Sequence, residues 1–127
     1  MIDALFNQSN YAATKKMMDA TALRHEAIAS NLANIETPNY KRIDISSSFQ
    51  SELKAAMGEK DVSKISSLSP SFAEDPTAVA ANRDGNTVQL ESELLKLNQN
   101  TMAHTLETHL VTGTLLKLRL AITGRPS

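Results

Sequence analysis

The sequence contains no cysteine and no tryptophan, and aromatic residues make up only 4% of its 127 residues. Without cysteine, the chain forms neither disulfides nor thiolate metal sites, and the sequence does not indicate the redox state of its compartment. No run of about 18 apolar residues occurs, so we expect no membrane-spanning helix. The first residues, Met1 to Gln8, lack the basic and apolar regions of a secretion signal, so we also expect no cleaved leader.

The chain also lacks an excess of charge and the motifs of common enzyme classes. Its formal net charge is −1, whereas a nucleic-acid binder depends on an excess of Lys and Arg. Phosphate-binding GxxxxGK[ST], GxSxG, HExxH and dinucleotide-binding patterns are all missing. The carboxylates fall on polar helix faces or in loops, and no pattern collects two of them in a pocket. The sequence therefore predicts no enzyme, no cofactor and no nucleic-acid partner.

What the chain does contain is helix-forming Ala, Leu and Met, arranged first in a long N-terminal series. The steps of this series alternate between three and four residues, which is the spacing of one helix face. We expect a helix from about Ser9 to Glu36, with Asn7, Ser9 or Asn10 as its N-terminal cap. The helix should end near Glu36 because Pro38 follows. Leu23 lies off this face, so a second contact surface is possible. The members of the series are Tyr11, Thr14, Met18, Thr21, His25, Ile28, Leu32 and Ile35.

A second series with the same spacing runs through the C-terminal part of the chain. We expect Asn86 to cap this helix with Gln89 reaching back, and Gly124 and Pro126 to end it. The series comprises Leu90, Leu94, Leu97, Thr101, His104, Thr108, Val111, Leu115, Leu118 and Ile122. A neighbouring apolar stripe comprises Leu95, Met102, Leu106, Leu110, Leu116 and Leu120. Two stripes need two partners, so we expect the first helix to cover one and a neighbouring molecule to cover the other.

Between the helices, residues 43–86 are rich in Ser, Pro, Asn, Asp and Gly. One short helix is predicted from Ser48 to Met57, ended by Gly58, and the rest has the pattern of loops. The predicted fold is all-α, with the long terminal helices packed as a coiled-coil hairpin around an irregular middle region. Its parts are an N-terminal helix over 1–37, a turn and middle region over 38–86, and a C-terminal helix over 87–127.

Two features of these helices have more than one interpretation. His25 and His104 fall on the predicted contact faces and could face each other, but further metal ligands are missing from the neighbouring turns. Hydrogen-bonded histidines are the better prediction, and no metal site is expected. Gly113 interrupts the second helix, and marks either a close approach or bend between subunits or a tolerated weak position.

The end of the first helix carries a recognisable motif, Ala29-Ser-Asn-Leu-Ala-Asn-Ile-Glu-Thr-Pro-Asn-Tyr40. It resembles the signature of bacterial flagellar rod and hook proteins, roughly A-x-N-x-A-N-x-x-T-P-G-Y. Asn39 stands where the family has Gly, and Asn is the next residue to tolerate a positive φ. The turn Asp84–Val88 before the last helix is similar to that of the proximal rod proteins. The residues that match the signature are Asn31, Ala33, Asn34, Thr37, Pro38 and Tyr40.

This resemblance implies a structural subunit of the flagellar basal-body rod, the periplasmic drive shaft that transmits torque to the distal rod and hook. Such a chain is made in the cytoplasm and leaves it through the flagellar type III export apparatus. Its implied partners are copies of itself, other rod proteins, the membrane-ring protein and the ring–rod adaptor. We expect its assembly seams at Ile28, Leu32, Ile35, Leu90, Leu94, Leu97, Val111, Leu115, Leu118 and Ile122.

The alternative from a different class is a helical export chaperone or adaptor. Such a binding module is a folded dimer in solution, with the apolar faces of its helices paired, whereas a rod subunit alone is incompletely packed. Sedimentation at micromolar concentration separates these two hypotheses. An enzyme, the third hypothesis, needs a pocket that the sequence does not predict.

Overall fold

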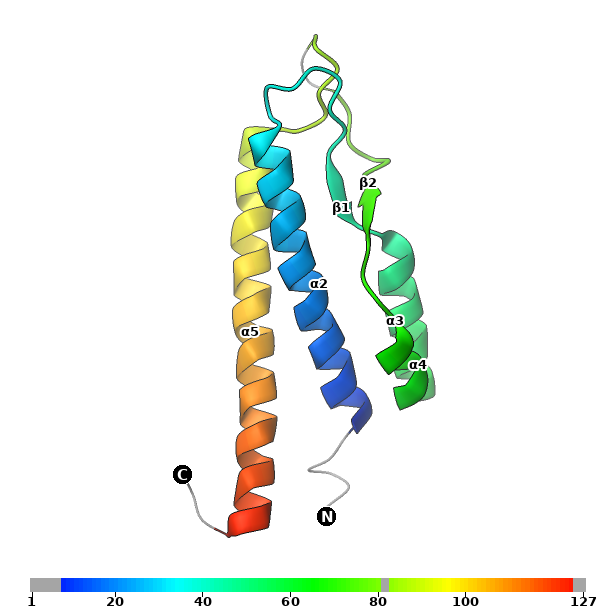
Figure 1. Cartoon of the computed structure of the whole chain (residues 1–127), viewed down its shortest axis with the longest axis vertical. Coiled ribbons are helices and arrows are strands. Elements are labelled where there is room, and N and C mark those ends of the chain that lie inside the picture. Colours follow the sequence, from blue (N-terminus) through cyan, green and yellow to red (C-terminus); the bar gives the residue numbers. More distant parts are fainter. Residues whose placement is uncertain (1–7, 81–82, 125–127) are drawn as a thin grey trace.

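Two long helices run side by side along most of the molecule in the computed structural model, which describes residues 8–80 and 83–124 (Figure 1). The first is α2, Gln8–Ala33, and the second is α5, Leu90–Thr123. The middle of the chain lies against the side of α2 that faces away from α5. No helix within these described ranges combines the length and the hydropathy that a membrane span requires.

Both long helices lie close to their predicted positions, but their ends differ in detail. α2 ends at Ala33, three residues before the predicted Glu36, and a series of turns leads from there to Pro38. Ser9 and Asn10 lie inside the helix rather than capping it, and Asn7 lies outside the described residues. At the end of α5 the prediction for Gly124 is confirmed, because it has φ 66° and donates its N–H to the Leu120 carbonyl at 2.7 Å. Pro126 lies outside the described residues.

The middle region contains more regular structure than its composition predicts. α3, Ser47–Glu59, confirms the predicted short helix. It runs past Gly58, however, and ends at Lys60, which has φ 54°. A further short helix, α4, Val62–Ser67, begins where the Asp61 carboxylate accepts a hydrogen bond from the Lys64 N–H at 3.2 Å.

A small sheet makes the prediction of an all-α fold wrong in this part of the chain. β1, Ile43–Ile45, pairs antiparallel with β2, Phe72–Glu74, with Ile43 opposite Glu74 and Ile45 opposite Phe72. Only Ile43, Asp44 and Ile45 alternate between apolar and polar residues, and three residues are too few for a strand signal. The fold is therefore mostly helical, with long terminal helices and one two-stranded sheet.

The apolar core lies between α2 and the middle region, and not between the two long helices. Phe49 and Leu53 of α3 and Ile65 of α4 pack with Ala13 of α2 in one buried cluster. Leu23 packs against this cluster, which confirms the second contact surface predicted for α2. The full cluster consists of Ala13, Ile45, Phe49, Leu53, Ala56 and Ile65, with Ala12, Ala20, Leu23 and Leu68 around it.

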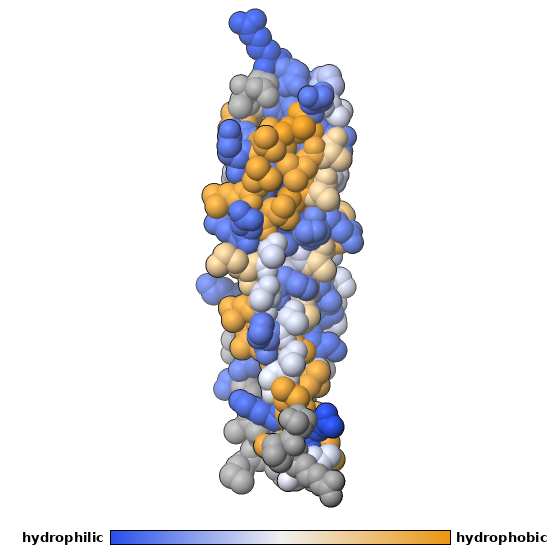
Figure 2. All heavy atoms as spheres, turned by 90° about the vertical axis from the view of Figure 1, so that its left-hand side faces the viewer, coloured by the Kyte–Doolittle hydropathy of each residue, from blue (hydrophilic) through white to orange (hydrophobic). Residues whose placement is uncertain are grey.

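The outer face of α5 carries many exposed apolar side chains, and Figure 2 shows them gathered most densely over the upper part of the molecule. Between its leucines, the hydroxyls of Thr101, Thr105 and Thr108 donate to carbonyls four residues earlier, at 2.8–2.9 Å. Because each hydroxyl is satisfied within the helix, these threonines expose methyl groups rather than free donors. The large exposed apolar side chains of α5 are Leu90, Leu94, Leu95, Met102, Leu106, Leu110, Leu115, Leu116, Leu120 and Ile122.

Candidate functional site

The signature motif forms the corner where the chain leaves α2, and Asn31 lies at its centre. Asn31 is fully buried. Its amide nitrogen donates to the Ile43 carbonyl at 2.9 Å and to the Glu93 carboxylate at 3.3 Å. Its side-chain oxygen accepts from the Ile43 N–H at 2.9 Å and from the Tyr40 hydroxyl at 3.2 Å. All the donors and acceptors of this side chain are therefore satisfied, and they join α2, β1 and α5.

Asn86, which lies shortly before α5, holds the turn that follows α2. Its amide nitrogen donates to the carbonyls of Asn34, Ile35 and Thr37 at 2.8, 3.1 and 2.9 Å. These carbonyls belong to the turn that follows α2, since α2 ends at Ala33. Its predicted role as the cap of α5 is wrong, because α5 begins at Leu90 after Gln89, and Gln89 makes no side-chain capping bond. Asn86 instead ties the turn after α2 to the segment before α5.

The turn between these elements brings Asn39 against Gly85. Asn39 has φ 61°, so it adopts the left-handed conformation expected at this position of the motif. Its N–H donates to the Asp84 carbonyl at 2.8 Å. Gly85 has φ 78°, and a Cβ there would lie 2.5 Å from the side-chain oxygen of Asn39. The exposed Asn39 side chain can move away from such a Cβ, so the positive φ is what favours glycine at residue 85.

Arg42 brings three carboxylates together behind the corner, a cluster that the sequence pattern does not indicate. Its Nε lies 2.6 Å from Glu93 Oε1, and one terminal nitrogen lies 2.6 Å from Asp75 Oδ2 and 3.3 Å from Asp44 Oδ2. The Arg24 Nε donates to the other oxygen of Asp44 at 2.9 Å. A cavity of about 280 Å³ lies beside Arg42, Asp75 and Glu93. Because the carboxylates are paired with guanidinium groups, the cluster links the elements rather than supplying acid–base groups.

The pKa values of this cluster are consistent with a permanent ion network. Burial lowers the pKa of Arg42, but hydrogen bonds from its guanidinium to Glu93 and Asp75 outweigh burial and raise that pKa above its usual value. Burial raises the pKa of Asp44, yet the N–H of Ile45 and the guanidinium of Arg24 hold it below its ordinary value. The hydroxyl of Thr77 and Arg42 likewise lower the pKa of Asp75. All three groups stay ionised at neutral pH.

The interface between α2 and α5 is polar rather than a continuous apolar seam. The buried residues of α5 are Glu93, Asn100 and Glu107. The Asn100 amide donates to the Thr21 carbonyl at 2.8 Å, and the Thr21 hydroxyl donates to Glu107 at 2.9 Å. The same hydroxyl lies 3.0 Å from His104 Nδ1, which confirms a hydrogen-bonded histidine at that position, while His25 is exposed.

The signature residues differ in how deeply they are buried. Asn31 is buried, Asn34 and Tyr40 are half-buried, and Ala33, Thr37 and Pro38 are exposed. The residues predicted as assembly seams also divide. Ile28 is buried, and the half-buried ones are Leu32, Ile35, Leu97, Val111 and Leu118. The exposed ones are Leu90, Leu94, Leu115 and Ile122. Their contacts with other copies stay a prediction.

Sequence reasoning missed Arg42, Glu93 and Gly85 as parts of the corner. Arg42 follows directly after the motif, but an arginine in a loop is usually solvated, so nothing in the sequence marks it as buried. Glu93 lies in the first turn of α5, where the helix dipole favours a carboxylate without any partner. Its pairing with Arg42 depends on how the turn before α5 packs against β1, and the sequence alone does not show that packing.

Comparisons with known proteins agree with this geometry. Residues 18–41 match the family model of flagella basal body rod proteins. The chain is 31% identical over 113 residues to the flagellar basal body rod protein FlgB of Borrelia hermsii, covering 75% of this chain and 82% of that protein. It is 33% identical over 112 residues to FlgB of Borreliella burgdorferi, covering 74% and 81%. FlgB of Escherichia coli is 28% identical over 115 residues, covering 78% and 82%.

The long terminal helices, the signature corner and these matches define a flagellar basal-body rod protein. It is a structural protein of the flagellum and not an enzyme. Within that class, the chain belongs to the FlgB family. Its place is therefore the basal body of the bacterial flagellum.

Proposed function

We propose that this chain is a subunit of the proximal rod, the periplasmic drive shaft that transmits torque from the membrane ring to the distal rod and hook. Within the rod, α2 and α5 pack as a coiled-coil hairpin against the helices of neighbouring subunits. The neighbours are copies of this chain and other rod proteins, with the membrane-ring protein and the ring–rod adaptor at the base. The flagellar type III export apparatus delivers the chain from the cytoplasm.

The observation that supports this proposal is the exposed apolar face of α5. Ten large apolar side chains of this helix are exposed in the single chain, each by 44% or more. Covering apolar surface stabilises a complex by about 25 cal/mol per Å² removed from water. A neighbour that covers this face therefore adds stability that the isolated chain lacks. Torque transmission follows from many such contacts packed side by side around the rod.

The substitution Leu115→Asp tests the proposal. Leu115 is 47% exposed in the single chain, so the aspartate should change the free energy of unfolding by less than about 0.5 kcal/mol. In a packed seam it would bury a charge, so we expect the variant to be exported but absent from purified basal bodies. Motility in a strain that lacks the native chain reports the same outcome.

The matched control is Gln50→Asp, at an exposed position of α3. It adds the same charge away from the apolar face and should leave assembly and motility intact. If cells with Leu115→Asp still build motile flagella, the seam assignment is wrong.

A further inference from the structure

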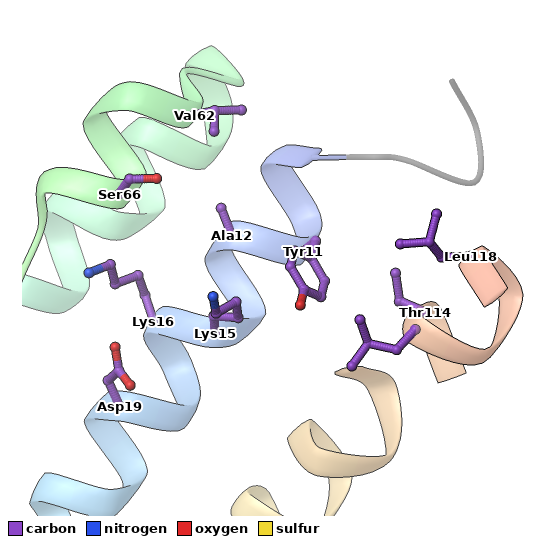
Figure 3. A pocket seen from close by; sticks show the side chains of 10 residues that line it. Tyr11, Ala12, Lys15, Lys16, Asp19, Val62, Ser66, Thr114 and Leu118 are labelled. Carbon is purple, nitrogen blue, oxygen red and sulfur yellow. The ribbon is translucent and has the colours of Figure 1, made fainter. Parts of the chain in front are cut away.

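The two long helices separate at the end of the molecule where α2 begins. After Glu107, no described residue of α5 is fully buried. A groove of about 550 Å³ lies here between α2, α4 and α5, and we call it the open-end groove (Figure 3). Its apolar walls come from Tyr11, Ala12, Val62, Leu115 and Leu118. A second cavity of about 400 Å³ lies beside it and shares Tyr11.

The rim of the open-end groove carries more positive than negative charge. Lys15, Lys16 and Asp19 line it from α2. Lys15 Nζ lies 5.6 Å from the centre of the Tyr11 ring, close enough for a cation–π contact that holds the ammonium over the groove. A ligand that suits this groove is therefore apolar, with a negative charge at its edge.

A surface of that description occurs at the other end of the same chain. Leu90, Leu94 and Leu95 are exposed by 49, 44 and 58%, and we call them the α5 patch. Figure 2 shows apolar side chains gathered over this end of the molecule. Glu91, in the first turn of α5, is exposed among these leucines.

We propose that the open-end groove of one copy receives the α5 patch of a second copy, with Lys15 and Lys16 facing Glu91. Leu94 and Leu115 are separated by about 30 Å along α5, at 1.5 Å per residue, so the patch cannot fill the groove of its own chain. A contact between two different surfaces passes from each copy to the next, and it either closes into a ring or winds along an axis. The proposal rests on the assembly described above and assigns the two surfaces that meet.

Disulfide cross-linking between two singly substituted chains tests this contact, and the absence of native cysteine makes it selective. One chain carries Leu95→Cys in the patch, and the other carries Ser66→Cys on the α4 wall of the groove. Both are expressed in one strain, basal bodies are purified, and the disulfide is formed by mild oxidation. We expect a cross-linked dimer of Leu95→Cys with Ser66→Cys. We expect none between Leu95→Cys and Gln50→Cys, the control on α3.

Charge reversal supplies a second, independent readout. Glu91→Lys should lower the yield of that cross-link about fivefold, which is the effect of roughly 1 kcal/mol from an exposed ion pair. Adding Lys15→Glu and Lys16→Glu to the partner chain should restore the yield. A yield unaffected by Glu91→Lys overturns the predicted charge contact.

The outcomes separate this inference from the proposed function. If both single-cysteine chains enter basal bodies but do not cross-link, the inference is wrong and the proposed function stands. If neither chain enters basal bodies although the same strain assembles the native chain, the substitutions have blocked the contact. The cross-link is then sought with Thr114→Cys, another position in the groove. Failure to form that cross-link also overturns the inference. An intrachain disulfide in a chain carrying Leu5→Cys with Ser66→Cys would assign the groove to the chain's own N-terminal residues instead.

Discussion

Two buried asparagines hold the corner by different means. Asn31 exchanges hydrogen bonds with both the N–H and the carbonyl of Ile43, whereas Asn86 donates to three carbonyls of the turn after α2. Both uses need an amide, since a carboxylate has no donor and an alanine has neither donor nor acceptor. The corner therefore depends on side-chain chemistry at positions where size alone would permit several residues.

Asn86→Ala should lower the free energy of unfolding by about 2 kcal/mol, because it removes the hydrogen bonds of a buried amide to carbonyls of the turn after α2. Chemical denaturation at neutral pH measures this change. Asn98→Ala, at an exposed position of α5, is the control and should stay within about 0.5 kcal/mol of the native chain. Equal effects of the two substitutions would show that the turn after α2 does not need the amide of Asn86.

At the residue level, the sequence predicts the motif but not the partners of its side chains. Asn31, Asn34 and Tyr40 are recognisable by their spacing, and the left-handed turn at Asn39 follows from its residue type. The prediction that Asn86 caps α5 was wrong. An asparagine shortly before a helix is typical of an N-cap, and its residue type does not reveal a contact with a distant segment. Only the spatial position of the α2 end decides between these roles.

The two long helices are predictable as elements, but the side that each turns inward is not. The heptad spacing of α5 fits both its apolar stripe and the polar series Glu93, Asn100 and Glu107. The polar series faces α2 because Asn31 and Thr21 offer matching groups there. A pattern of apolar residues alone assigns the interior to the leucines, and so misses an interface specified by hydrogen bonds.

Glu107 is the weak point of this polar interface, because burial raises the pKa of its carboxyl above the ordinary value. Because its pKa is raised, this carboxyl binds a proton at a higher pH in the folded chain than in the unfolded chain. Stability therefore increases as the pH falls through the folded pKa, and this gain is complete near the unfolded value. Glu107→Gln should stabilise the chain at pH 7 and remove that gain, because it removes the buried charge.

Unfolding monitored by circular dichroism from pH 7 to pH 4.5 checks this expectation. Glu52→Gln, at an exposed position of α3, is the control and should leave the pH dependence unchanged. A loss of stability at pH 7 in Glu107→Gln would mean that the ionised carboxylate stabilises the interface.

Gly113 interrupts α5 without a packing reason inside the chain, since a Cβ there would have no neighbour within 4 Å. Gly113→Ala should therefore raise the free energy of unfolding by about 0.5–1 kcal/mol. Gly124→Ala should do the opposite, because Gly124 has φ 66°. Thermal unfolding compares the two. If Gly113→Ala stabilises the chain but impairs its incorporation into basal bodies, the glycine serves a close approach between subunits. If incorporation is unchanged, Gly113 is a tolerated weak position.

On the scale of the whole molecule, one end is held by the corner network and the other is open. The network of Arg42 and Glu93 lies where α5 begins, whereas no described residue of α5 after Glu107 is fully buried. We expect amide hydrogens of α5 after Glu107 to exchange at least about tenfold faster than those between Glu93 and Glu107. Hydrogen-exchange mass spectrometry of the isolated chain measures both. Uniform protection along α5 would contradict an open end.

The hydrogen bonds from Asn86 to the turn after α2 have a consequence for the order in which the molecule forms. When the chain emerges from the ribosome, α2 is complete after residue 33, but the side chain that holds the following turn comes some 50 positions later. Until then this turn has only its local hydrogen bonds, such as those from the N–H groups of Thr37 and Tyr40. The corner is therefore a late event, because it needs residue 86 for this amide and residue 93 for the carboxylate that pairs with Arg42.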